Sequence, residues 1–156
     1  MNTDDHWLTF AVDLALANVA EGGGPFAAVV VADGMLVADG TNRVTLDLDP
    51  TAHAEVVAIR AACRTQGEFA LEGATLFTSC EPCPLCLAAC LWARLDRVVY
   101  AADRYAAASA GFDDVRFYEL LALAEGEWPL LIERVEVPDS NVPFEAWNAK
   151  DDRVPY

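Results

Sequence analysis

The chain has 156 residues, 54% of them hydrophobic, and a formal net charge of −15. This length and composition are enough for one domain with a full hydrophobic core, so we expect a single domain over residues 1–156. The 25 acidic side chains outnumber the 10 basic ones, which argues against a nucleic-acid partner, because Lys and Arg supply most of the non-specific affinity for phosphate.

Hydrophobic patterns divide the chain into expected helices and strands. Helical spacing of apolar residues predicts helices over residues 4–20, 52–66, 84–94, 105–110 and 115–124. Strand-like apolar runs are predicted at residues 26–31, 35–39, 74–79, 97–101 and 130–135, with Asp33-Gly34 as a hairpin turn between the first two. Strands that alternate with helices indicate an α/β protein, and we expect a three-layer α/β/α sandwich around a mixed five-stranded sheet.

The most informative motif combines His53 and Glu55 with the later segment Pro82-Cys83-Pro84-Leu85-Cys86. A structural zinc site uses four protein ligands, whereas a catalytic site leaves one position to water. We therefore predict that His53, Cys83 and Cys86 bind one zinc ion and that Glu55 carries protons beside the bound water. A His-x-Glu segment followed by Pro-Cys-x-x-Cys is typical of zinc-dependent base deaminases.

Both halves of this motif lie at expected helix starts. Helical residues two apart point roughly 200° away from each other, so His53 and Glu55 can share a site only beyond the helix N-terminus. Cys83 and Cys86 are three apart and lie on one face of the first turn. We therefore expect two helix N-termini to converge on the metal, where their positive ends stabilise thiolates.

Two other uses of the cysteines remain open. Cys80, Cys83, Cys86 and Cys90 match the spacing of the bacterial ferredoxin ligand run, although Leu91 replaces the proline of that run. A helix from Pro84 would also place Cys90 about 10 Å along the axis from Cys83, too far for shared ligation. A structural zinc site closed by Cys80 or Cys90 is the second alternative. The cysteines outside the metal motif are more simply small buried residues.

The expected compartment is the cytoplasm. Asp4 and Asp5 stand where a secretory signal would carry basic residues, and no apolar run approaches the length of a membrane span. The five cysteines are an odd number, and a domain of this size needs no disulfide scaffold. We therefore expect no membrane partner.

Five segments carry a family resemblance: residues 23–26, 49–55, 78–86, 111–114 and 143–147. Through them the chain resembles the cytidine deaminase superfamily and, within it, the bacterial guanine deaminases. The zinc motif is shared by the whole superfamily. The Gly-Phe-Asp-Asp segment at 111–114 and the aromatic C-terminal end are narrower features that point to the guanine branch.

This resemblance implies a cytidine deaminase-like fold and the zinc-dependent hydrolysis of guanine to xanthine and ammonia. It implies that the C-terminal segment, about 137–156, crosses to a partner subunit, where Tyr156 closes the site, so a homodimer is expected. The implied substrate-binding residues are Asn42, Asp114, Phe26, Trp92, Ala54 and Tyr156. Considered without the family, Asn42 fits a turn, Asp114 a helix cap, and Phe26 and Trp92 a core.

Several other functions share the metal motif. A cytosine, cytidine or triazine (ammeline-type) deaminase would differ only in the substrate pocket. A transfer-RNA adenosine deaminase is disfavoured by the net charge, and a non-catalytic zinc-binding module has no use for Glu55. An ionised Asp114 only accepts hydrogen bonds, which suits the ring N–H donors of guanine, whereas adenine would leave it underpaired.

Overall fold

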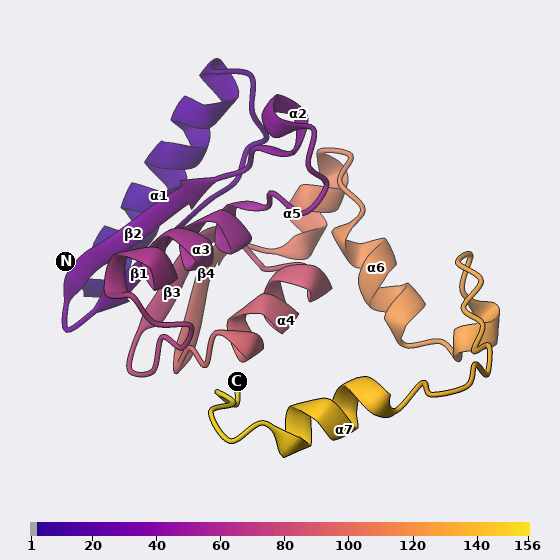
Figure 1. The fold of residues 1–156 in the computed structure, drawn as a ribbon. Helices are drawn as coiled ribbons and strands as arrows, with labels where there is room; N and C mark the ends of the chain where they lie inside the picture. Colours follow the sequence, from indigo (N-terminus) through magenta and orange to yellow (C-terminus); the bar gives the residue numbers. More distant parts are fainter. Residues whose placement is uncertain (1–2) are drawn as a thin grey trace.

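The computed structural model describes residues 3–156 and contains one mixed four-stranded sheet within them (Figure 1). The strands are β1 (Ala27–Ala32), β2 (Met35–Thr41), β3 (Thr75–Cys80) and β4 (Arg97–Ala102). Their order is β2-β1-β3-β4: β1 runs antiparallel to both of its neighbours, and β3 is parallel to β4. The expected α/β class is confirmed.

The helices of the described residues are α1 (Thr3–Ala20), α2 (Val44–Asp47), α3 (Ala54–Gln66), α4 (Pro84–Trp92), α5 (Arg104–Ser109), α6 (Asp114–Leu121), η1 (Glu125–Glu127) and α7 (Val142–Ala149). None of these helices combines the length and the apolar character that a membrane crossing would require. The predicted hairpin turn is also present, and both Asp33 and Gly34 have positive φ, as a tight β-hairpin turn requires.

Helices lie against both faces of the sheet. Along β1, Val29 and Val31 point toward α1, whose Trp7 and Leu14 pack against them. The alternate residue Val30 faces α3, because successive strand side chains point to opposite faces. Small residues of α3 let this helix lie close to the sheet. These residues are Ala54, Ala58 and Ala62, all buried.

Strand β2 approaches α3 even more closely, at Gly40. A Cβ atom at this position would lie 2.4 Å from the amide nitrogen of Ala58 and 2.6 Å from the carbonyl oxygen of Ala54. Only glycine fits there without displacing the helix. Helix α3 begins one residue after His53. Gly40 therefore fixes how closely this helix start lies against the sheet.

The predicted fifth strand over residues 130–135 is wrong. This segment has no regular structure, and Leu130, Leu131 and Ile132 are more than half exposed. A strand needs a neighbouring backbone for its hydrogen bonds and a surface against which to pack. Residues 130–135 pair with none of the four strands and are exposed, so their apolar content does not produce a strand.

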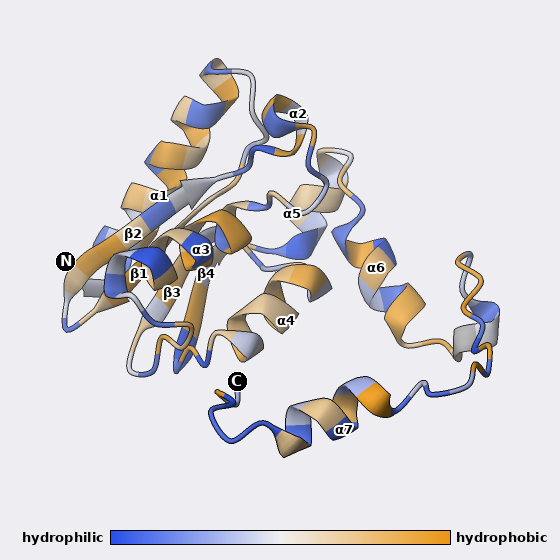
Figure 2. Cartoon of the chain, viewed as in Figure 1, coloured by the Kyte–Doolittle hydropathy of each residue, from blue (hydrophilic) through white to orange (hydrophobic). Residues whose placement is uncertain are grey.

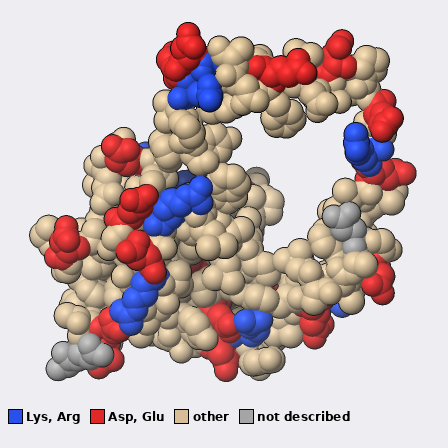
Figure 3. Space-filling view, turned by 90° about the horizontal axis from the view of Figure 1, so that it is seen from below, with Lys and Arg blue, Asp and Glu red and all other residues tan. Residues whose placement is uncertain are grey.

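Residues 122–156, here called the C-terminal arm, leave the body after α6 and return with α7 toward α4 (Figure 1). Nearly all of its side chains are exposed, including those of Val142, Phe144 and Trp147. Along the arm, hydrophobic and hydrophilic residues are mixed (Figure 2). In the space-filling view the arm forms an arc with an opening between it and the body (Figure 3). The arm therefore buries little surface against its own chain.

Candidate active site

Two helix N-termini meet at the predicted metal ligands, as expected. His53 precedes α3 and Cys83 precedes α4, both with extended backbone conformations, and neither side chain caps its own helix. Both side chains are therefore available to point across the gap between the helices. Pro84 occupies the first turn of α4, where its missing N–H has no hydrogen bond to lose, so the predicted helix start is confirmed.

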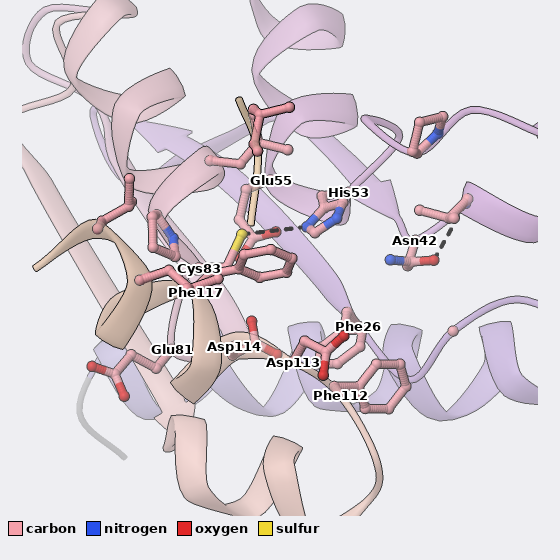
Figure 4. Close-up of a pocket in the computed structure, with 18 of the residues that line it drawn as sticks. Phe26, Asn42, His53, Glu55, Glu81, Cys83, Phe112, Asp113, Asp114 and Phe117 are labelled. Atoms are coloured by element: carbon pink, nitrogen blue, oxygen red, sulfur yellow. Dashed lines mark hydrogen bonds between the residues drawn. The ribbon is translucent and has the colours of Figure 1, made fainter. Parts of the chain in front are cut away.

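The three donor atoms form a compact triangle (Figure 4). The Nδ1 atom of His53 lies 3.5 Å from the Sγ atoms of both Cys83 and Cys86, and the two sulfurs are 3.6 Å apart. Tetrahedral zinc, with Zn–S of about 2.3 Å and Zn–N of about 2.0 Å, separates such donors by about 3.8 Å for S–S and about 3.5 Å for S–N. The donor set therefore fits a zinc ion with a fourth position left open.

The protonation states of the two thiols favour the binding of a dication. The hydrogen bond with Cys86 lowers the pKa of Cys83 to about 4. The same contact raises the pKa of Cys86, since its ionisation would bury a second negative charge beside the first. The pKa of His53 is raised, first by its hydrogen bond with Cys83. One thiolate is thus stable beside one thiol, and a dication that replaces the proton would favour both thiolates.

Glu55 lies beside this triangle and is 6% exposed. Its Oε1 accepts a hydrogen bond from the hydroxyl of Thr78 on β3 at 3.3 Å, and its Oε2 accepts one from the Cys86 thiol at 3.3 Å. Burial raises the pKa of the Glu55 carboxyl above its ordinary value. A raised pKa makes the carboxyl group a better proton acceptor than an ordinary glutamate, which suits an acid–base catalyst.

A cavity of about 630 Å³ opens beside the donors. It brings together most of the predicted site residues: Phe26, Asn42, His53, Glu55, Cys83 and Asp114. The Asn42 Oδ1 accepts a 3.3 Å hydrogen bond from the Val44 amide, and the amide nitrogen of Asn42 points toward His53 in Figure 4. Asn42 thus forms the local contact of a turn residue and also faces the cavity. Burial raises the pKa of Asp114, in the first turn of α6.

Trp92 and Tyr156 lie elsewhere in this chain. They line a second cavity, of about 580 Å³, together with Ile59 and Val154, and their ring centroids are 5.8 Å apart. Neither residue lines the cavity that contains His53. Ala54 is fully buried in the core at the start of α3. Substrate contacts by Trp92, Tyr156 and Ala54 stay predictions.

Sequence reasoning missed much of the cavity wall that α6 and its flanks supply. The additional wall residues include Phe112, Phe117, Leu120, Leu121 and Trp128. Phe112 packs edge-on against Phe26, with ring centroids 4.7 Å apart. The spacing of Phe117, Leu120 and Leu121 along a helix was the available signal, because residues three and four apart share a face.

A second feature that the sequence did not predict is a set of contacts between the loop before Cys83 and helices α5 and α6. The Arg104 guanidinium forms a 2.5 Å ion pair with Glu81, whose other oxygen accepts a 3.0 Å hydrogen bond from the Arg104 amide. Arg104 also lies over the ring of Tyr118, 3.4 Å from its centroid. The Tyr118 hydroxyl donates a 2.7 Å hydrogen bond to the carbonyl of Pro82. These contacts hold the loop before Cys83 against the helix that carries Asp114.

A His/Cys/Cys donor set beside a buried glutamate is typical of zinc-dependent deaminases, and two helix N-termini bring these side chains together here. Residues 1–102 match the family model for the cytidine and deoxycytidylate deaminase zinc-binding region, and the chain belongs to this family.

Known relatives are similar over most of the chain. Guanine deaminase from Bacillus subtilis is 48% identical over 142 residues, which are 90% of this chain and 91% of the relative. An X-ray structure of guanine deaminase from Bacillus subtilis matches with a TM-score of 0.94 and 45% identity, covering 97% of this chain and 98% of that chain. A tRNA-specific adenosine deaminase from Haemophilus influenzae is 33% identical over 129 residues, 79% of this chain and 75% of the relative.

Proposed function

We propose that this protein hydrolyses guanine to xanthine and ammonia. The observation that carries this proposal is the match to guanine deaminase from Bacillus subtilis, with a TM-score of 0.94 over 97% of the chain. This likeness includes the C-terminal arm, whereas the tRNA-specific relative matches 79% of the chain. The net charge of −15 also disfavours a nucleic-acid substrate.

The residues around the donor triangle account for the chemistry. A zinc ion held by His53, Cys83 and Cys86 would lower the pKa of a water molecule at its open position. Glu55 would take a proton from that water as the oxygen adds to the carbon bearing the amino group. Glu55 would give that proton to a ring nitrogen. In the later step it would take the remaining proton of the added hydroxyl and give it to the amine as the carbon–nitrogen bond breaks, which leaves the carbonyl of xanthine and releases ammonia.

The rest of the cavity would select the base. An ionised Asp114 accepts hydrogen bonds from N–H donors of the guanine ring, and the Asn42 amide faces the same space. Phe26 lines the wall and offers an aromatic face for stacking. Adenine as the free base would leave the Asp114 carboxylate underpaired, which is costly in a partly buried site.

Ultraviolet assays of the purified, zinc-loaded protein test the substrate. Guanine, adenine, cytosine and cytidine are supplied in parallel, and a transfer-RNA anticodon stem-loop is supplied as the nucleic-acid comparison. We expect conversion of guanine to xanthine, with the other compounds turned over far more slowly. Turnover of cytidine or of the stem-loop without turnover of guanine would overturn the proposal.

We also propose a homodimer in which residues 137–156 are exchanged, within a cytoplasmic protein whose five cysteines are free. The exposed apolar side chains of α7, including Phe144 and Trp147, support an interface with a second copy. A monomeric mass by light scattering at micromolar concentration would contradict the dimer.

Co-expression tests the exchange itself. One chain carries Glu55→Gln and an intact arm, and the other has an intact site but lacks residues 150–156. If the arm completes the partner's site, the mixed dimer regains activity although each chain alone is inactive. If each arm serves its own chain, the mixture stays inactive, because no site then has both Glu55 and a complete arm.

A further inference from the structure

Asn18, near the end of α1, joins three separate segments of the chain. Its side chain is 2% exposed, and its Nδ2 donates two hydrogen bonds of 2.8 Å each. One goes to the carbonyl of Gly24 and the other to the carbonyl of Asn42, which is 24 residues away in sequence. Both N–H groups of the buried Asn18 amide therefore form hydrogen bonds to the backbone of segments that line the cavity.

The glycine run before β1 has no chemical role in the proposed mechanism. The packing of Asn18 and Asn42 explains why glycine stands at positions 23 and 24. A Cβ atom at Gly23 would lie 2.3 Å from the Nδ2 of Asn18. At Gly24, a Cβ atom would lie 2.8 Å from the Oδ1 of Asn42. Side chains at these two positions would push the asparagines out of place. The loop therefore needs glycine because two asparagine amides pack directly on it.

The same contacts fix the edge of the cavity as one unit. The amide of Asn42 donates a 2.9 Å hydrogen bond to the carbonyl of Phe26, so the loop and the end of β2 are joined twice. The Asn42 side-chain oxygen is held by the amide of Val44. With its carbonyl, amide and side-chain oxygen all engaged, Asn42 has one orientation in which its Nδ2 faces the cavity.

We propose that Asn18 is the positioning residue of the substrate pocket. It does not line the cavity, and it acts by fixing Asn42 and the loop that leads into Phe26. This inference rests on the proposed function, because it assumes that Asn42 binds the base. It assigns Asn18 to substrate binding alone, since its amide contacts neither the metal ligands nor Glu55.

A double-mutant cycle with Asn18→Ala and Asn42→Ala in the full-length, zinc-loaded protein tests this role. Misplacement of Asn42 by about 1 Å would lower kcat/KM for guanine by roughly 100-fold, mainly through KM, with zinc content unchanged. In the Asn42→Ala background, Asn18→Ala should lower kcat/KM by far less than roughly 100-fold, because only its effect through the loop that leads into Phe26 remains. Leu14→Ala is the control. Leu14 also lies on α1, but it packs against Val29 and Val31 of the sheet.

Gly23→Ala provides a second variant in case Asn18→Ala folds poorly. It should raise KM on its own but have little effect when combined with Asn18→Ala, because the atom that it meets is then gone. Full additivity in the Asn18/Asn42 cycle, or an unchanged KM in folded Asn18→Ala, would overturn the proposal. So would a normal KM in Asn42→Ala.

Hydrogen exchange separates this inference from the proposed function. Asn18→Ala should speed amide exchange at residues 22–26 and 42–44 by at least about tenfold, whether or not guanine is the substrate. A protein that never turns over guanine but shows this local change would refute the proposed function alone. Unchanged exchange at both segments would refute the role of Asn18.

Discussion

Gly40→Ala should damage the metal site although Gly40 is not a ligand. The new Cβ would lie 2.4 Å from the Ala58 nitrogen and 2.6 Å from the Ala54 oxygen, both backbone atoms of α3. Ordinary contact begins at roughly 3.5 Å, so α3 must move by about 1 Å. Overpacking of this kind costs about 1–3 kcal/mol of stability.

The displaced helix start carries both His53 and Glu55. In the donor triangle, His53 lies 3.5 Å from each sulfur, so a shift of about 1 Å moves it out of ligand distance. We expect weaker zinc binding and a loss of roughly 100-fold in kcat/KM, more than the loss of stability alone would produce.

Zinc affinity is measured by competition with a chromophoric chelator, and the free energy of unfolding is measured by urea denaturation. Gly126→Ala is the matched control, because a Cβ there meets nothing within 4 Å. Gly40→Ala with normal zinc affinity and normal kcat/KM would refute the conclusion that the contact between β2 and α3 sets the position of His53.

Three further predictions follow from the site. Cys86→Ser should abolish stoichiometric zinc binding in metal analysis, because a buried hydroxyl is a poor zinc ligand; retained zinc would contradict the donor assignment. Tyr118→Phe should lower the free energy of unfolding by about 1 kcal/mol through loss of the bond to the Pro82 carbonyl, and an unchanged urea midpoint would contradict this. Asp114→Asn should raise KM for guanine at least about tenfold while zinc content stays constant; an unchanged KM would exclude contact with the base.

The metal site could be predicted from sequence because its geometry is local. The pair His53 and Glu55 and the pair Cys83 and Cys86 are each set by one helix start, and Pro84 marks the second start in the sequence itself. Hairpin chemistry at Asp33-Gly34 is equally local. In each of these cases, neighbouring residues determine the backbone conformation, so the pattern is sufficient.

The features missed from sequence depend on contacts between distant segments. The Asn18 bond to Asn42 joins residues 24 apart, and the pairing of Glu81 with Arg104 joins residues 23 apart. No local pattern specifies these partners. The predicted strand at 130–135 failed for the related reason that strand formation requires a neighbouring strand, and the apolar content of the segment does not provide one.

The most direct test compares Glu55→Gln with the unaltered protein at equal zinc content, by ammonia release and xanthine formation from guanine. A glutamine side chain is nearly isosteric with glutamate but cannot carry a proton, so zinc should stay bound while kcat falls by about 10²–10⁴-fold. Near-normal turnover in this zinc-loaded variant would contradict the assignment of Glu55 as the proton carrier of a guanine deaminase.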